Sequence, residues 1–317
     1  MDNKINNLVD SLSKKYEQTG QDLSSYLEGL LVSDYVPYWE YIHLDTLLTL
    51  QKPKTKIPDE RIFIMYHQIT ELYFRLILDE CEQITSNIKS SEHANEFEMR
   101  LNRINRYFKN LTDSFDVMSI GMEKEQFLTF RMALLPASGF QSAQYRTIEL
   151  FATELLNLVH VEKRHLFDHK SDIESMYPFI YWKNGATEVS TGKKTFTLQQ
   201  FEEHYDHKLI HIAKSLELKT IGSIYTTHFK TNDSIKNALK KFDLNVNVNW
   251  PLAHFKTAVK YLQQEPETIA ATGGTNWQKY LPPRFQKRIF YPFIWTEDEK
   301  NEWGKQWVEE ARKEVSK

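Results

Sequence analysis

His67 and Arg131 stand in apolar segments of the chain, where a charged or titratable side chain needs a partner or a ligand. His67 follows Phe63 by four residues, so the two side chains are expected on one stripe of a helix. An imidazole on an apolar face is either a core histidine bonded to a carbonyl, or an acid, base or hydrogen-bonding group in a pocket. The spacing leaves both interpretations open.

Arg131 is flanked by two of the most apolar stretches of the chain, residues 127–130 and 132–135. Its guanidinium stays charged, so a buried position requires an anionic partner. That partner is an internal carboxylate if the residue is structural, or a substrate carboxylate bound through two parallel hydrogen bonds if it is functional. Phe127, four residues earlier, shares the expected helix face.

His254 is a third polar side chain on an apolar helix face. Pro251 suits a first helical turn, and Ala258 continues the face on which His254 lies. A single helical histidine in an apolar cleft can be the axial ligand of a haem, although this arrangement has no sequence signature of its own. A core histidine fits the same pattern.

Other histidines recur at helical spacing without a convincing metal motif. Two imidazoles one turn apart can bind zinc or iron, but the chain has no HExxH motif, and a di-iron bundle needs paired Glu-x-x-His motifs that are absent here. We therefore expect solvated helix faces at these positions: His165 and His169, and His204, His207 and His211.

The Thr272-Gly273-Gly274-Thr275 segment holds the only Gly-Gly pair of the chain. It lacks the glycine spacing and the lysine of a phosphate-binding P-loop. We expect a flexible loop there, which is either a plain connection or a substrate lid that brings hydroxyls to a pocket.

Long helices must position these residues. Only 10 of the 317 residues are glycine, about half of the usual share of roughly 7%. From Glu60 to Cys81, apolar residues recur at steps of three and four, which predicts a buried helix. The same periodicity recurs at about 96–115, 124–135, 142–163, 198–216, 233–241, 251–264 and 297–314.

The fold class predicted from this pattern is all-α, with eight to ten helices in a bundle. No repeat or Pro/Ser/Gly-rich linker divides the chain, so we expect one domain over residues 1–317. Residues 184–196 contain the turn signals of a small hairpin or irregular loop.

The composition excludes several classes of protein. With 40 Lys and Arg against 43 Asp and Glu, the chain has no cationic field for a nucleic-acid backbone. Its single cysteine, Cys81, forms neither an internal disulfide nor a thiolate zinc site. No segment reads as a secretory signal or approaches the roughly 18 apolar residues of a membrane span. We expect a cytoplasmic protein with neither a nucleic-acid nor a membrane partner.

Three segments of the first half carry a family resemblance. They are YWEYIHLDTLL at residues 38–48 with Gln51, DERIFIMYHQITEL at residues 59–72, and FRMALLPASGFQSAQYRTIE at residues 130–149. In order and spacing they resemble the YxxYLxLDxLLxxQ, DExLFIxxHQxxELW, FRxxL and SGFQSxQYRxIE motifs of the tryptophan 2,3-dioxygenase family. In the second half, His254 and Thr272-Gly273-Gly274 resemble the family's proximal histidine and its GTGG loop.

The resemblance implies a helical enzyme that binds haem b, active in its Fe2+ form. It would insert both atoms of dioxygen across the indole C2–C3 bond of L-tryptophan to give N-formylkynurenine, the first step of the kynurenine pathway. His254 would be the axial ligand of the haem iron, and Ser138 and Gly139 would border the oxygen side. The haem would supply the oxygen chemistry, and the protein would supply orientation.

The resemblance also implies the substrate contacts. Phe63 would pack against the indole, and His67 would accept a hydrogen bond from the indole N–H. Arg131 would pair with the amino-acid carboxylate, and Thr272 would meet the ammonium group. Where many family members have a tyrosine, this chain has Phe127, which removes a hydroxyl able to contact the carboxylate. Such a hydrogen bond is worth about 0.5–1.5 kcal/mol, so we expect weakened tryptophan binding.

Family enzymes complete each active site with residues from a neighbouring subunit. The matching positions are Tyr38, Tyr41 and Ile42, so the resemblance implies a homotetramer in which residues 1–50 contact a neighbour. Two alternatives remain open: a haem enzyme that oxidises a substituted indole in specialised metabolism, and a helical haem-binding protein without turnover.

Overall fold

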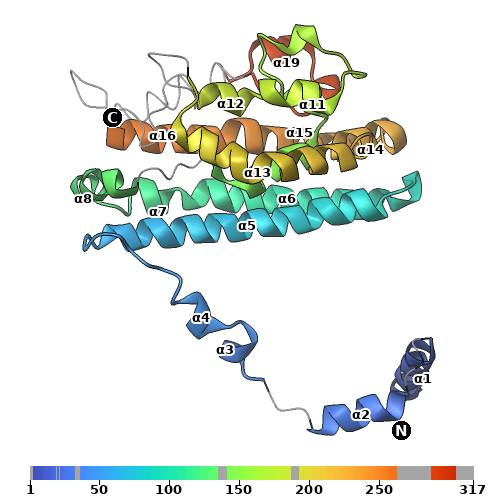
Figure 1. Cartoon of the computed structure of the whole chain (residues 1–317). Coiled ribbons are helices and arrows are strands. Elements are labelled where there is room, and N and C mark those ends of the chain that lie inside the picture. The colour runs from blue at the N-terminus through green and yellow to red at the C-terminus, as the bar shows by residue number, and fades with distance from the viewer. Residues whose placement is uncertain are drawn as a thin grey trace. The chain divides into compact units, whose positions relative to one another are not determined.

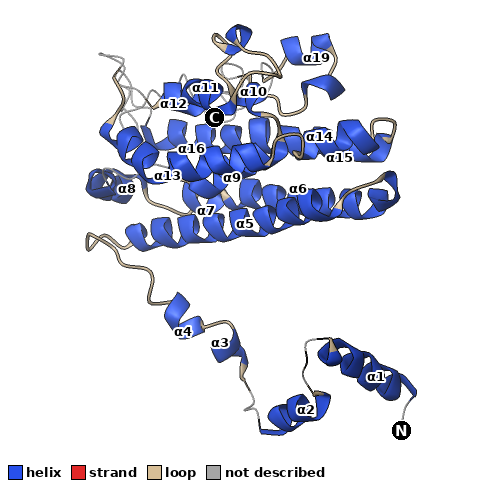
Figure 2. Cartoon of the chain, turned by 45° about the vertical axis from the view of Figure 1, so that its right-hand side comes forward, coloured by secondary structure: helices blue, strands red, loops and turns tan. Residues whose placement is uncertain are grey.

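The computed structural model describes residues 3–18, 20, 22–32, 36–134, 141–186, 193–262 and 287–304. Within these ranges the chain forms helices and turns and no β-strand, and an isolated bridge pairs Val159 with Ile180 (Figure 2). The all-α prediction is confirmed. By its internal contacts the chain divides into two units, Met1–Gln51 and Lys52–Lys317.

The first unit contains four helices, α1 (Asn3–Glu17), α2 (Leu23–Val32), α3 (Tyr38–Tyr41) and α4 (Leu44–Leu47). The Tyr16 and Tyr26 rings stack with centroids 4.0 Å apart and join α1 to α2. None of these helices buries a residue, because their apolar side chains are exposed or half-buried. The boundary of this unit lies one residue beyond the 1–50 segment expected to contact a neighbouring subunit.

Two long helices form one layer of the second unit. Helices α5 (Asp59–Asn87) and α6 (Ala94–Ser114) lie side by side and are joined by a short 3-10 turn, Ser91–His93 (Figure 1). Their buried residues recur at steps of three and four, as periodicity predicts for amphipathic helices. The helix expected from Glu60 to Cys81 is confirmed, and it continues to Asn87.

A second layer covers α5 and α6. It contains α9 (Ala143–Ala152), α13 (Phe196–Ser215) and α15 (Asp233–Leu244), and α15 continues through a π-turn, Asn245–Asn249, into α16 (Trp250–Leu262). Side chains cap the first turns of α9, α13 and α15: the oxygens of Ser142, Thr195 and Asn232 accept from the third backbone N–H that follows each of them.

Short elements complete the described part of the second unit. They are α7 (Asp116–Ser119), α8 (Lys124–Phe130), α10 (Leu155–Leu158), α11 (Ile173–Met176), α12 (Tyr181–Gly185), α14 (Ile221–His228), α19 (Glu297–Asn301), and the 3-10 turns Arg131–Leu134, Arg164–Leu166, Tyr177–Phe179 and Pro292–Ile294. None of the described helices is long and apolar enough to cross a bilayer.

One sequence prediction about elements was wrong in part, and another lies partly outside the described residues. The helix expected over residues 142–163 ends at Ala152, where the Thr153 hydroxyl donates to the Phe290 carbonyl at 2.5 Å. His165 therefore lies in a 3-10 turn and His169 in a turn, so neither is on the expected helix face. The hairpin expected near residues 184–196 falls largely on residues 187–192, which lie outside the described residues.

Buried apolar side chains gather in two clusters. The larger cluster joins α5, α6, α9, α13 and α15. The smaller cluster, which we call the distal cluster, joins the start of α5 to α7, α8 and α16 and includes Tyr66, Phe130, Leu252, Phe255 and Tyr261. Phe63 and Phe127 pack against it as half-buried side chains. The distal cluster is therefore the part of the fold that positions the predicted site.

Candidate active site

His67 has a defined hydrogen-bonding state in this structure. Its Nδ1 lies 2.7 Å from the carbonyl oxygen of Phe63, one turn earlier on α5. Because a carbonyl only accepts, Nδ1 must donate, and in the neutral ring Nε2 keeps its lone pair. Burial lowers the pKa of His67, although the Phe63 carbonyl and the charge of Glu71 oppose that shift. At neutral pH the side chain therefore presents Nε2 as an acceptor.

His254 lies on α16, and its ring stacks on Phe115 with centroids 5.8 Å apart. Burial, with a smaller contribution from the charge of a protonated His67, lowers the pKa of His254 to about 4. Among the described residues, none hydrogen-bonds to the His254 ring. The structure thus brings two neutral imidazoles, from α5 and α16, within electrostatic reach of each other.

Both imidazoles combine accessible surface with desolvation of the ring. More than a third of the surface of each residue is accessible, yet protein atoms surround each ring closely enough that burial dominates its pKa shift. Desolvation of this kind requires protein atoms close to each ring, because a fully hydrated imidazole would keep its ordinary pKa. We call the accessible surface of these two rings the histidine recess.

An aromatic wall stands beside His67. The Phe63 ring packs on His67 with centroids 4.1 Å apart and meets Phe130 edge-on at 5.8 Å. Phe127 lies 6.3 Å from Phe63 and 4.9 Å from Tyr261, so it bridges α5, α8 and α16. This wall offers an aromatic ligand flat, polarisable surface next to an acceptor nitrogen.

Arg131 begins the 3-10 turn that follows α8, directly after Phe130. It is 5% exposed, and burial lowers the pKa of its guanidinium from the usual 12.5. The group remains a cation at neutral pH because arginine does not lose its proton in proteins. A desolvated cation beside the aromatic wall suits recognition of a carboxylate.

The remaining predicted residues belong to the first unit, to other helices, or to segments outside the described residues. Ser138, Gly139 and Thr272 lie outside the described residues. Tyr38 and Tyr41 belong to the first unit, where they are 70% and 78% exposed, and Ile42 is half-buried. The histidines of α13, His204, His207 and His211, are exposed, as expected of a solvated helix face. No cluster of metal-ligating side chains occurs among the described residues.

Comparison with known proteins bears directly on these residues. The model of the family described as "Tryptophan 2,3-dioxygenase" matches residues 29–172, which include His67 and Arg131. A tryptophan 2,3-dioxygenase from a Ruegeria species is 40% identical over 83% of this chain and 92% of its own length. The chain belongs to the tryptophan 2,3-dioxygenase family. Relatives of the same name from Bacillus anthracis and a Polaromonas species are 38% and 34% identical over 81% of this chain, and over 90% and 85% of their own lengths.

Sequence reasoning missed the neighbours of His254. Phe115 stacks on its ring, and Trp250 packs against Phe115 with centroids 4.6 Å apart. Trp250 precedes His254 by one helical turn, and this spacing is a signal that the sequence did contain. Phe115 lies more than a hundred residues away in sequence, so only the packing of α6 on α16 reveals it.

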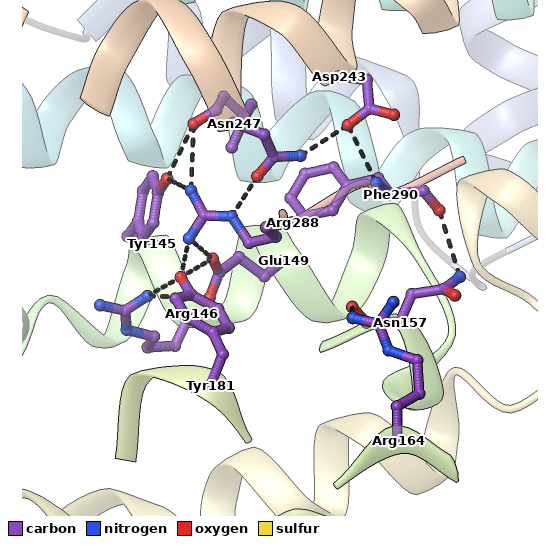
Figure 3. A network of polar contacts seen from close by, with 11 residues as sticks. Tyr145, Arg146, Glu149, Asn157, Arg164, Tyr181, Asp243, Asn247, Arg288 and Phe290 are labelled. Carbon is purple, nitrogen blue, oxygen red and sulfur yellow. Dashed lines mark hydrogen bonds and ion pairs between the residues drawn. The ribbon is translucent and has the colours of Figure 1, made fainter. Parts of the chain in front are cut away.

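A buried polar network was also missed. Tyr145, Arg146 and Glu149, part of the family motif at residues 130–149, do not form the histidine recess but surround Arg288 (Figure 3). The Glu149 carboxylate accepts from Arg146 and Arg288, each at 3.0 Å, and from the Tyr181 hydroxyl at 2.5 Å. These motif residues therefore hold α9 to distant segments of the chain.

Proposed function

We propose that this protein is a haem-dependent tryptophan 2,3-dioxygenase. It inserts both atoms of dioxygen across the indole C2–C3 bond of L-tryptophan and releases N-formylkynurenine. The observation that carries this proposal is the histidine recess: His67 presents an acceptor nitrogen beside Phe63, and His254 presents a second neutral imidazole from another helix. Membership of the family agrees with this arrangement.

The residues present fit a haem at His254. A haem iron needs a neutral imidazole with a free lone pair, an open space in front of it and apolar surroundings. His254 has a lowered pKa and accessible surface, the Phe115 ring stacks on it, and Trp250 packs against Phe115. We infer that His254 would bind the iron of haem b, which in its Fe2+ form would supply the activation of dioxygen.

The protein's own residues bind and orient the indole. The Phe63 ring packs against the indole face, and the Nε2 atom of His67 accepts the indole N–H. His67 orients the substrate rather than removing this proton, because an indole N–H is a very weak acid. The orientation of its Nε2 atom is held by the 2.7 Å bond from Nδ1 to the Phe63 carbonyl.

Arg131 holds the amino-acid end of the substrate. Its desolvated guanidinium pairs with the carboxylate through two parallel bonds. We assign Thr272 to the ammonium group, and Ser138 and Gly139 to the oxygen side of the pocket, on the basis of their positions in the family motifs. Phe127 leaves the carboxylate without the hydroxyl that a tyrosine would donate.

We propose a homotetramer in which Tyr38, Tyr41 and Ile42 complete the site of a neighbouring subunit. Two observations support this arrangement. The helices of the first unit bury none of their residues and expose many apolar ones. In addition, α5 exposes an apolar stripe at steps of four, three and four residues: Met65, Ile69, Leu72 and Leu76. Such spacing suits packing against a helix of another copy.

The experiment that tests the function is turnover by reduced, haem-reconstituted protein with L-tryptophan in the presence and absence of dioxygen. We expect N-formylkynurenine to accumulate only with dioxygen, and we expect the His254→Ala variant to lose both its haem and its activity. Fully haem-loaded wild-type protein that leaves tryptophan unchanged would contradict the proposal. A His254→Ala variant that retains haem and turnover would remove His254 from the assigned role.

A further inference from the structure

The helix that carries His254 is joined to α15 by a π-turn. The backbone N–H of Trp250 donates to the Asn245 carbonyl, five residues earlier, and α15, the turn and α16 form one continuous helical rod. Pro251 explains the turn: proline has no N–H and its ring clashes with the carbonyl four residues earlier, here that of Asn247. The chain relieves both problems by widening at residues 245–249.

The direction of His254 depends on this turn. In a regular α-helix each residue rotates the chain by about 100°, so a turn with one extra residue changes the direction of every side chain that follows. If the π-turn relaxed, α16 would rotate relative to α15. The imidazole of His254 would then leave its place beside Phe115.

Side-chain amides on the turn are all hydrogen-bonded. Asn245 Nδ2 donates to Asn105 Oδ1 on α6 at 3.0 Å, and Asn249 Nδ2 donates to Asn245 Oδ1 at 3.0 Å. Asn247 Nδ2 donates to Asp243 Oδ1 at 2.7 Å, and Asn247 Oδ1 accepts from Arg288 Nε. Asn247 thus connects an anion on one side of the turn to a cation on the other.

Asp243 ties the turn to the segment that follows residue 287. Its carboxylate is fully buried and accepts four hydrogen bonds, from Asn247, from the backbone N–H groups of Phe290 and Tyr291 at 3.0 and 3.2 Å, and from Trp295 Nε1 at 2.9 Å. With four donors, the carboxylate of Asp243 has no free site for water. Figure 3 places Asp243, Asn247 and Phe290 along one edge of the network.

Arg288 ties the same turn to α9 and α12. Its guanidinium is buried and donates to Asn247, to the Tyr181 hydroxyl, to Glu149 Oε1 at 3.0 Å, to the Tyr145 hydroxyl at 3.2 Å and to the Val246 carbonyl at 3.3 Å. Val246 and Asn247 both belong to the π-turn. Arg288 therefore fixes the turn through a main-chain and a side-chain contact at once.

We propose that Asp243, Asn247 and Arg288 are positioning residues that hold the π-turn and thereby set the direction of the His254 imidazole. The proposal rests on the proposed function in one respect, which is that His254 ligates the haem. Residues that orient a metal ligand from outside typically change metal affinity about 10- to 100-fold when they are removed. We expect an effect of that size on haem affinity.

The test is the Asn247→Ala variant, which breaks the link between Asp243 and Arg288 but leaves both groups in place. We expect its haem affinity to fall about 10-fold or more, and the Fe–His stretching band of the ferrous protein to shift in resonance Raman spectra. Asp243→Asn replaces one acceptor oxygen with an NH2 group, which would face the groups that donate to Asp243. This variant should shift the same band. The matched control is Glu80→Gln, which disturbs a buried ion pair between α5 and α6 and removes no hydrogen bond to the turn, because Glu80 pairs with Arg100 and Arg103.

The control separates positioning from general stability. We expect Glu80→Gln to lower the melting temperature while leaving the Fe–His band and haem affinity at their wild-type values. Wild-type haem affinity and an unshifted band in Asn247→Ala would overturn the proposal, and so would an equal shift in the control. The His254→Ala variant distinguishes the two proposals. If it still shows an Fe–His band, His254 is not the haem ligand and the proposed function fails at that point. If it loses the band while Asn247→Ala keeps the wild-type band and haem affinity, only the positioning role of Asn247 is overturned.

Discussion

At the scale of single residues, the site depends on polar groups whose state is set by their surroundings. The Phe63 carbonyl fixes the ring of His67, and burial keeps both His67 and His254 neutral. Burial also leaves Arg131 as a poorly hydrated cation. His67 and Arg131 therefore make separate, measurable contributions to substrate binding.

Replacing Arg131 by Leu should raise the KM for L-tryptophan strongly while the haem content stays unchanged. A hydrogen-bonded charge pair is worth about 1.5–3 kcal/mol, which corresponds to roughly a 10- to 150-fold increase in KM. Steady-state kinetics and the haem-to-protein absorbance ratio measure the two quantities. A parallel loss of haem would instead give Arg131 a structural role.

Replacing Phe127 by Tyr should improve tryptophan binding. The ring is half-buried between Phe63 and Tyr261, and a hydroxyl able to reach the substrate carboxylate is worth about 0.5–1.5 kcal/mol. We expect KM to fall roughly 2- to 10-fold with kcat little changed. An unchanged or higher KM would show that the ring does not face the carboxylate.

The activity should resist mild acid because the pKa of His67 is lowered. Only the neutral ring offers Nε2 as an acceptor, and a lowered pKa means that protonation begins below the ordinary histidine value of 6.5. We expect kcat/KM for tryptophan to stay constant from pH 8 to about 6.5 and to decline only at lower pH. In His67→Ala this acid limb should be absent, and an acid limb centred above pH 6.5 in the wild type would contradict the assignment.

At the scale of helices, periodicity predicted a good part of what the structure contains. The ranges of α5, α6, α13, α15 and α16 agree with apolar steps of three and four, because each helix buries one face against its neighbours. The end of α9 and the π-turn were not predictable in this way. Thr153 bonds to Phe290 and Asp243 bonds to Tyr291, and such contacts between distant residues leave no periodic signal in the sequence.

The network around the π-turn predicts an unusual pH dependence of stability. Burial raises the pKa of Asp243 from 3.8 to about 6 although four hydrogen bonds lower it. A carboxyl with a raised pKa in the folded state favours folding below pH 3.8, and that contribution is lost as the pH rises through about 6. Relative to Asp243→Asn, which cannot ionise, the wild-type protein should lose about 2 kcal/mol of unfolding free energy between pH 4 and 7.

Urea denaturation of both proteins across this pH range measures the difference. The lowered pKa values of His67 and His254 act in both proteins and cancel in the comparison. We expect the unfolding free energy of Asp243→Asn, relative to that of the wild type, to increase as the pH rises. A gap that does not change with pH would show that Asp243 ionises normally.

At the scale of the whole molecule, the unburied first unit and the exposed stripe on α5 predict association between copies. Leu72 is 55% exposed at the centre of the stripe, and a glutamate there would place a charge in a helix interface. We expect Leu72→Glu to reduce the mass measured by light scattering from that of a tetramer to that of a smaller species. Leu218, 80% exposed and outside the stripe, supplies the control: Leu218→Glu should keep the wild-type mass.

Several residues of the candidate site could be predicted from the sequence, but the packing that brings them together could not. His67, Phe63, Arg131 and Phe127 were predicted from apolar surroundings and family motifs, and the structure places them around the distal cluster. What spacing could not supply was the proximity of His67 to His254, since the two rings come from helices nearly two hundred residues apart in sequence. That proximity follows only from the packing of α16 on the other layer.

The central claim is that the histidine recess serves the insertion of both oxygen atoms into the indole of L-tryptophan. The most direct measurement is mass spectrometry of the product formed by ferrous, haem-reconstituted protein under isotopically heavy dioxygen. We expect N-formylkynurenine that carries two heavy oxygen atoms. A product with one heavy oxygen atom, or no conversion of tryptophan by fully haem-loaded protein, would contradict it.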